Sequence, residues 1–190
     1  MKTIAILGTL DTKGEEHAFA AELIRQRGHQ TLLIDVGTLN DPTVAPDVPR
    51  ADIIGDQRFA DRGAAVAAMA EAAAVFCAKL VAEKKIDGII SLGGGGGTAI
   101  GTAVMRALPV GFPKLMVSTL AASESVPSYM GVKDVTMMPS IVDVAGLNRI
   151  SRPIFANAAG AICGMVETAR PVAEDNPVIV ASMFGNTTDC

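Results

Sequence analysis

Short apolar runs alternate along this chain with longer amphipathic or alanine-rich segments. The apolar runs cover residues 3–7, 31–36, 86–92, 114–117 and, less clearly, 135–138. Runs of this length between turn residues are typical of buried β-strands. Helical spacing or composition marks the segments 15–27, 63–85, 99–108 and 149–168. Because strands alternate with helices, the pattern predicts an α/β fold with a Rossmann-like, open, mainly parallel sheet and helices on both faces.

The segments between these elements are less regular. Residues 37–50 contain Pro42, Pro46 and Pro49 and predict a long loop, whereas residues 51–61 remain unassigned. Asn148 is placed to cap the last predicted helix, with Pro153 in its first turn.

Five consecutive glycines follow the third apolar run and precede a helical segment. Such a turn exposes backbone N–H groups, and the helix dipole favours an anion beside them. A flexible linker is the plainer alternative, but linkers rarely lie between a strand and an amphipathic helix. We interpret this stretch as a phosphate cradle that comprises Gly93, Gly94, Gly95, Gly96, Gly97 and Thr98.

Other predicted strands end in small or hydroxyl residues. The carboxyl ends of parallel strands share one edge of a sheet, where ligands bind, so these ends are expected to form a crevice with the glycines. After the first and fourth strands the candidate binding residues are Gly8, Thr9, Leu10, Asp11, Thr12, Lys13, Ser118 and Thr119. Asp35 ends the second strand, where an acid commonly meets ribose hydroxyls, although a loop-capping carboxylate is an equal alternative.

Common catalytic motifs are missing from the sequence. The glycines lack the lysine of a Walker A loop, and they match a dinucleotide fingerprint only weakly. His17 and His29 have no metal-spaced partner and are predicted to be surface residues. Asp11, Glu124 and Asp143 lie near the predicted loops, and one of these carboxylates could hold Mg²⁺ beside a phosphate. Turn capping is the simpler role for each. No catalytic nucleophile is identifiable.

Composition narrows the possible partners. A net charge of −4 and a pI near 5.1 argue against nucleic acid or an anionic membrane as the main partner. The three cysteines have no metal-ligand spacing, and we expect reduced thiols in a cytoplasmic protein. The apolar stretch 64–80 contains Glu71 and Lys79, which favours a buried helix over a membrane span.

The end of the chain resembles its beginning. Residues 178–183 form an apolar run followed by glycine and hydroxyl residues, as residues 4–7 do. We therefore expect a nucleotide-binding α/β domain over residues 1–175. Residues 176–190 are expected to be a linker and the first strand of a truncated second α/β domain.

Several longer motifs resemble a known family. They are residues 8–16, 93–98, 143–150 and 157–160. With them the chain resembles the N-terminal domain of plant tobamovirus-resistance proteins and their uncharacterised bacterial relatives. The resemblance implies an ATP-binding, Rossmann-like domain that forms homodimers and continues into a second domain. It implies nucleotide contacts at residues 8–13, 93–98 and 118–119.

Three hypotheses of function follow. The first is an ATP-binding module with optional Mg²⁺. The second is an enzyme that acts on a phosphorylated or carboxylated metabolite at a site shared with a second domain. The third is a dimerisation module built from the alanine-rich helix and the helix that contains Gly160 and Gly164.

Overall fold

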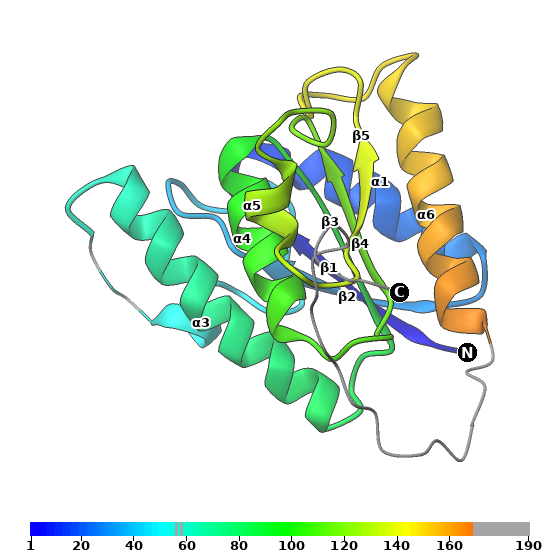
Figure 1. The fold of residues 1–190 in the computed structure, drawn as a ribbon, viewed down its shortest axis with the longest axis horizontal. Coiled ribbons are helices and arrows are strands. Elements are labelled where there is room, and N and C mark those ends of the chain that lie inside the picture. Colours follow the sequence, from blue (N-terminus) through cyan, green and yellow to red (C-terminus); the bar gives the residue numbers. More distant parts are fainter. Residues whose placement is uncertain (56, 58, 169–190) are drawn as a thin grey trace, which may run out of the picture.

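One parallel sheet organises the protein, for which a computed structural model describes residues 1–55, 57 and 59–168. Its strand order is β2-β1-β3-β4-β5, and every neighbouring pair is parallel (Figure 1). The predicted open parallel sheet is therefore confirmed. The strands are β1 (Thr3–Gly8), β2 (Gln30–Asp35), β3 (Gly88–Gly93), β4 (Lys114–Ser118) and β5 (Thr136–Pro139).

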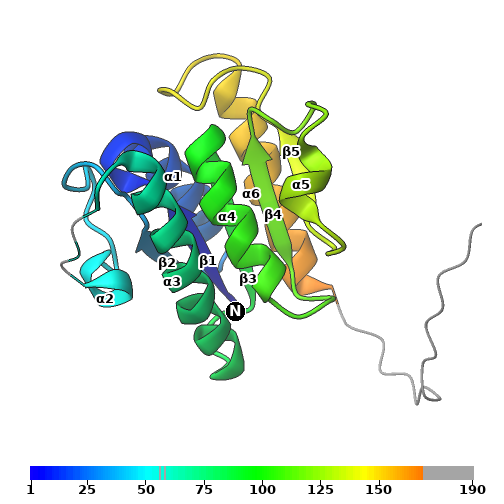
Figure 2. The ribbon, with the colours of Figure 1, turned by 60° about the vertical axis from the view of Figure 1, so that its left-hand side comes forward.

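Helices cover both faces of the sheet, as the sequence predicts (Figure 2). α1 (Leu10–Gln26) and α6 (Ser151–Glu167) pack together on one face. α3 (Arg62–Ala82) and α4 (Gly95–Ala107) pack together on the other. Two short helices join this second layer, α2 (Ala51–Ile54) beside α3 and α5 (Val126–Met130) beside α4.

The alternation of side chains along each strand produces two cores. In β1, Ile4 and Ile6 join the core beneath α1 and α6, whereas Ala5 and Leu7 join the core beneath α3 and α4. A strand buried on both faces needs apolar residues at every position, because successive side chains point to opposite faces. This explains why the sequence shows continuous apolar runs rather than an alternation of apolar and polar residues.

The topology opens a crevice between β1 and β3. β1 lies between β2 and β3, and the helices that follow β1 and β3 pack on opposite faces of the sheet. The chain therefore leaves these two neighbouring strands in opposite directions. In open α/β sheets, ligands bind in the gap created at such a switch in winding.

Two segments predicted as loops are instead the first turns of helices. α1 begins at Leu10 rather than near Glu15, and the backbone of Lys13 leaves helical geometry with φ −133° and ψ 25°. α4 begins at Gly95, so three of the five glycines lie within the helix. Propensity misled the prediction here, since tertiary contacts override the low helix preference of glycine.

α3 is more exposed than the sequence suggested. It is long and apolar enough to span a membrane, with a mean hydropathy of 1.8, but it packs along α4 and α2. Only one side of it is buried, and Val75 on the other side is 74% exposed. The predicted strand 178–183 and the second-domain segment 176–190 lie outside the described residues.

α6 begins with the cap that the sequence predicted. The side-chain Oδ1 of Asn148 accepts hydrogen bonds from the N–H groups of Ile150 and Ser151, at 2.8 and 3.0 Å. The Ser151 hydroxyl in turn accepts from the N–H of Asn148 at 2.9 Å. This reciprocal pair satisfies donors that a helix start leaves free. Pro153 lies in the first turn, as predicted.

We expect Asn148→Ala to lower the free energy of unfolding by about 1 kcal/mol, because the substitution removes that cap. Urea denaturation at neutral pH measures the change. Asn157→Ala, at an exposed position within the same helix, serves as the control and should leave stability nearly unchanged. Equal stability of the two variants would contradict the capping role.

Candidate functional site: the crevice between β1 and β3

The glycine run forms a bare helix start at the end of β3. Gly94 is the N-cap residue, and the first helical hydrogen bond runs from the N–H of Thr98 to the carbonyl of Gly94, at 2.8 Å. No side chain caps α4 among the described residues. The N–H groups of Gly95, Gly96 and Gly97 precede that first bond, and groups in this position have no acceptor inside a helix. The helix therefore presents free donors and its positive dipole end to the crevice.

Only one of the five glycines is required by packing. A Cβ on Gly93 would lie 2.9 Å from the Cα of Gly97, closer than real contacts allow. At Gly95 a Cβ would meet nothing within 4 Å. None of the five has a positive φ, so turn conformation does not demand glycine either. The other glycines leave the backbone open to a ligand.

The crevice is a cavity of about 190 Å³ in front of this helix start. The turn after β1 forms its opposite wall, with Thr9, Thr12 and Lys13, and the glycines Gly94 to Gly97 form the other. The structure therefore brings together the segments that follow the first and the third predicted strands, residues 8–13 and 93–98. The remaining lining residues are Asp11, Thr38, Leu39, Arg62, Val66, Ile100 and Asp143.

Arg62 is a site residue that sequence reasoning missed. It is the first residue of α3, and its Nη2 lies 3.9 Å from where a Cβ of Gly96 would be. Its guanidinium makes no hydrogen bond or ion pair within the described part of the chain. The sequence gives little sign of this role, because 30 residues separate Arg62 from the glycines and only the packing of α3 on α4 joins them.

His17 links the two walls of the crevice. Its imidazole is completely buried, so the predicted surface position is wrong. Nδ1 donates to the carbonyl of Lys13 at 2.6 Å, and Nε2 accepts from the N–H of Leu92 at 3.4 Å. Burial lowers the pKa of this imidazole below its ordinary value, which agrees with a neutral ring that both donates and accepts. A Cβ on Gly8 would lie 2.5 Å from the ring, so Gly8 provides its space.

His29 is also buried rather than on the surface, and its Nε2 lies 2.7 Å from a Glu167 oxygen. It lies away from the crevice, at the start of β2, and pairs this strand with the end of α6. The two histidines thus have structural positions that a search for metal spacing could not reveal.

Asp11 and Asp35 hold the loop after β2 against the crevice. Asp11 Oδ2 accepts from the N–H groups of Leu39 and Asn40, at 2.9 and 3.3 Å. Asp35 Oδ1 accepts from the N–H groups of Leu10 and Gly37. Both carboxylates serve as loop braces.

Asp35 does not reach the ligand space. Its side chain is only 1% exposed, and burial raises its pKa. Its Oδ2 has no hydrogen-bond partner among the described residues. The structure therefore places it as the loop-capping carboxylate of the two alternatives, rather than at a ribose.

Thr98 and Ser118 lie behind the crevice wall. Both are at most 1% exposed, and their hydroxyl oxygens are 2.7 Å apart. This bond joins the first turn of α4 to the end of β4, so the pair positions the helix start and does not line the crevice. Leu10 is likewise buried in the core. Thr119 is exposed, and its hydroxyl lies 3.8 Å from where a Cβ of Gly94 would be.

The three carboxylates considered for Mg²⁺ have different surroundings. Asp11 is engaged by backbone N–H groups, and Glu124 is exposed near α5 and does not line the crevice. Asp143 is exposed and faces Gly94, with an oxygen 4.0 Å from where a Cβ of Gly94 would be. No group of three or more metal-binding side chains occurs in the described residues. Asp143 alone fits a Mg²⁺ held mainly by phosphates.

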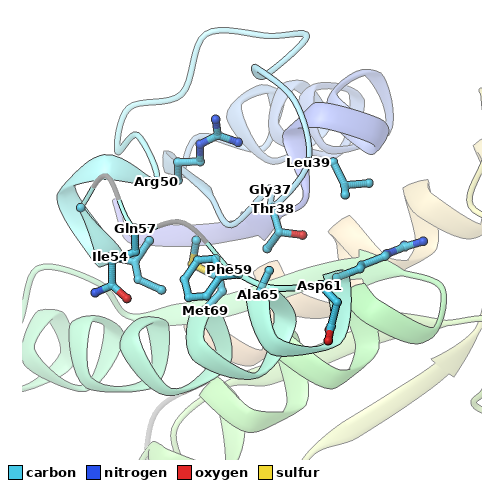
Figure 3. A pocket seen from close by; sticks show the side chains of 12 residues that line it. Gly37, Thr38, Leu39, Arg50, Ile54, Gln57, Phe59, Asp61, Ala65 and Met69 are labelled. Atoms are coloured by element: carbon cyan, nitrogen blue, oxygen red, sulfur yellow. The ribbon is translucent and has the colours of Figure 1, made fainter.

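A larger cavity of about 560 Å³ adjoins the crevice, and we call it the side chamber (Figure 3). It shares Thr38, Leu39 and Arg62 with the crevice. Figure 3 shows Phe59, Ala65 and Met69 grouped over α3. Its other lining residues are Gly37, Arg50, Ile54, Gly55, Gln57 and Asp61.

Comparison with protein families gives a match over nearly all of the described chain. Residues 2–171 match the N-terminal domain of the Uncharacterised protein family UPF0261. A UPF0261 protein of Mesorhizobium japonicum is 48% identical over 198 residues, which cover 100% of this chain and 49% of that protein. The chain thus spans about half the length of this bacterial relative.

A plant protein and several solved structures are also similar. The ToMV resistance protein Tm-1(GCR237) of tomato, Solanum lycopersicum, is 32% identical over 97% of this chain and 28% of its own length. A putative hydrolase of the alpha/beta superfamily from Xanthomonas campestris superposes with a TM-score of 0.48 at 10% identity. That superposition covers 88% of this chain and 99% of the hydrolase.

The packing at the glycine run generates a stability prediction. Gly93→Ala should destabilise the fold by about 1–3 kcal/mol, since backbone atoms of Gly97 have no room to move aside. Gly95→Ala should leave stability equal or raise it by up to about 1 kcal/mol, because its Cβ enters open space within a helix. Urea titration of both variants measures the change in the free energy of unfolding. Similar losses of stability at the two positions would contradict the conclusion that packing requires glycine at position 93 but not at position 95.

Burial of neutral His17 predicts a pH dependence of stability. Its folded-state pKa lies below the unfolded value near 6.5, so the unfolded chain binds more protons as the pH falls below 6.5. This contribution to stability is complete above pH 6.5 and is lost progressively at lower pH. We expect His17→Gln to flatten the slope of unfolding free energy between pH 6.5 and 5. An unchanged slope would show that other groups cause the dependence.

Proposed function

The chain belongs to the UPF0261 family, whose N-terminal domain it matches, and we propose that this domain binds ATP with the phosphates in the crevice between β1 and β3. The observation that carries the proposal is the uncapped start of α4, which faces Lys13 and Arg62 across the crevice. An anion is the ligand that free N–H groups and a positive dipole end favour.

The local charge of the crevice supports an anionic ligand. The chain as a whole carries a net charge of −4, yet Lys13 and Arg62 both line this small cavity. Asp11 and Asp143 also line it. Backbone N–H groups already neutralise part of the charge of Asp11 through hydrogen bonds, and Asp143 is the carboxylate that we assign below to Mg²⁺. A phosphate chain would therefore meet two side-chain cations and a row of backbone donors.

All but one of the predicted site residues fall into two groups. Gly94 to Gly97, Thr9, Thr12 and Lys13 contact the phosphates directly. A second group holds these residues in place, and its members are Gly8, Leu10, Asp11, Asp35, Gly93, Thr98 and Ser118. Thr119 belongs to neither group, because it lies beside Gly94 without lining the crevice. Lys13 and Arg62 replace the lysine of a Walker loop, which this chain lacks.

Mg²⁺ fits the same arrangement, with Asp143 as its protein ligand. Mg²⁺ in nucleotide sites commonly takes one or two carboxylates and completes its shell with phosphate oxygens and water. When bound, the ion would neutralise phosphate charge beside the Gly94 wall. Asp143 would orient it, and the exposed Thr119 hydroxyl lies next to the same wall.

We propose further that the domain works in the cytoplasm as a homodimer within a longer protein. Its described cysteines, Cys77 and Cys163, are unpaired and buried, which is consistent with a reducing compartment. The helix spacing of Gly160 and Gly164 does not by itself support the dimer, because Gly160 makes room for Arg27 of the same chain.

Gly95→Asp tests the proposal at the centre of the cradle. A carboxylate at this position should lower ATP affinity at least tenfold by repelling phosphate, and isothermal titration calorimetry with Mg-ATP measures it. The fold should tolerate the change, since the site is open and an acidic residue in a first helical turn stabilises by about 0.3–1 kcal/mol.

Gly95→Ala is the matched control and should retain most of the affinity. A melting temperature that rises with millimolar ATP in the parent chain and not in Gly95→Asp would agree with the titration. Equal ATP binding by parent and Gly95→Asp would remove the phosphate cradle from consideration.

A further inference from the structure

We infer that the side chamber receives the nucleoside end of the ligand whose phosphates lie in the crevice. The inference rests on the proposed function and deepens it by assigning the two ends of the nucleotide. Three observations support it: the two cavities join, the chamber lining has the chemistry that a nucleobase needs, and Arg62 lies on the way to the chamber whereas the described residues of a second neighbouring cavity include no cation.

The chamber and the crevice are continuous through α3 and the loop after β2. Thr38, Leu39 and Arg62 line both cavities. The first turns of α3 form a shared floor, because Val66 faces the crevice while Ala65 and Met69 face the chamber. A ligand can therefore extend from the glycines into the chamber past Arg62, which is placed to contact the linking phosphate.

The lining of the chamber suits a nucleobase. Apolar side chains, including Ile54, Phe59 and Met69, lie on several of its sides. The phenyl ring of Phe59 is partly exposed and lies over α3 with Ala65 and Met69 (Figure 3). Bases stack on aromatic rings through their flat faces, while their edges need polar partners.

The polar groups of the chamber supply those partners. Thr38 and Gln57 line it with a hydroxyl and an amide. Arg50 is fixed at its rim, where Nη1 donates to the carbonyl of Asn40 at 2.7 Å. The chamber volume of about 560 Å³ lies within the range of roughly 300–1,000 Å³ typical of small-molecule sites. The crevice, at about 190 Å³, holds only part of such a ligand.

A cavity at the ends of β4 and β5 is the competing place for the nucleoside. It measures about 500 Å³ and is lined partly by Pro139, Ile141 and Val142. It shares only Asp143 with the crevice. The route to the side chamber passes the guanidinium of Arg62, whereas the described residues that line the competing cavity include no cation. Electrostatics therefore favours the side chamber.

Binding of Mg-ATP and of inorganic tripolyphosphate to the 190-residue chain separates the two ends of the site. Tripolyphosphate carries the phosphates without a nucleoside. Phe59→Ala should weaken ATP binding about tenfold, since stacking of a base on an aromatic ring is worth about 1–3 kcal/mol. The same variant should leave tripolyphosphate affinity unchanged, and Phe59→Tyr should restore ATP affinity.

Two further variants serve as references. Arg62→Ala should weaken both ligands, because its guanidinium faces the phosphates. Phe19→Ala makes the same chemical change as Phe59→Ala on the opposite face of the sheet, where Phe19 packs on the other core, and should not alter the ratio of the two affinities.

The possible outcomes separate this inference from the proposed function. If the parent chain binds neither ligand, the proposed function fails and the nucleoside assignment fails with it. If tripolyphosphate binds and Phe59→Ala leaves ATP affinity intact, only the side chamber assignment is overturned. If Phe59→Ala weakens both ligands equally, Phe59 acts through the fold and the assignment is again overturned.

Discussion

The imidazole of His17 joins the two strand ends between which the crevice opens. By donating to Lys13 and accepting from Leu92, it fixes the turn after β1 relative to the end of β3. Both walls of the candidate site therefore depend on one buried ring. The ring in turn depends on Gly8, because any side chain there would occupy its space.

The remaining supports of the crevice are buried polar contacts. Asp11 and Asp35 bind backbone N–H groups of the loop after β2, and Thr98 bonds to Ser118 across the base of α4. A buried polar group costs free energy unless it is hydrogen-bonded, so each of these contacts resists local rearrangement. Within the described part of the chain, the groups at the crevice without such partners include the N–H groups of Gly95 to Gly97 and the side chains of Lys13 and Arg62. Rigid supports thus surround a small set of groups that are available to a ligand.

This division explains how far the sequence could predict the site. Residue type and strand position predicted that residues 8–13, 93–98 and 118–119 converge, since all three segments end parallel strands. Residues of the first two segments line the crevice together, whereas Ser118 and Thr119 do not line it. Residue type did not separate Thr9, which lines the crevice, from Thr98, which is buried behind it. A hydroxyl beside a glycine is compatible with both roles, and only the direction of the side chain distinguishes them. Arg62 and the side chamber were unpredictable because α3 joins the crevice through packing with α4.

By itself the sequence determined the α/β class, the parallel sheet, the glycine run between a strand and a helix, and the family resemblance. These features depend on local periodicity and on motifs of neighbouring residues, which the linear chain contains in full. The tertiary structure alone decided that His17 is a buried link, that Asp35 braces a loop and that Arg62 faces the glycines. Each of these roles depends on contacts between segments distant in sequence, which form only when the two helical layers close on the sheet.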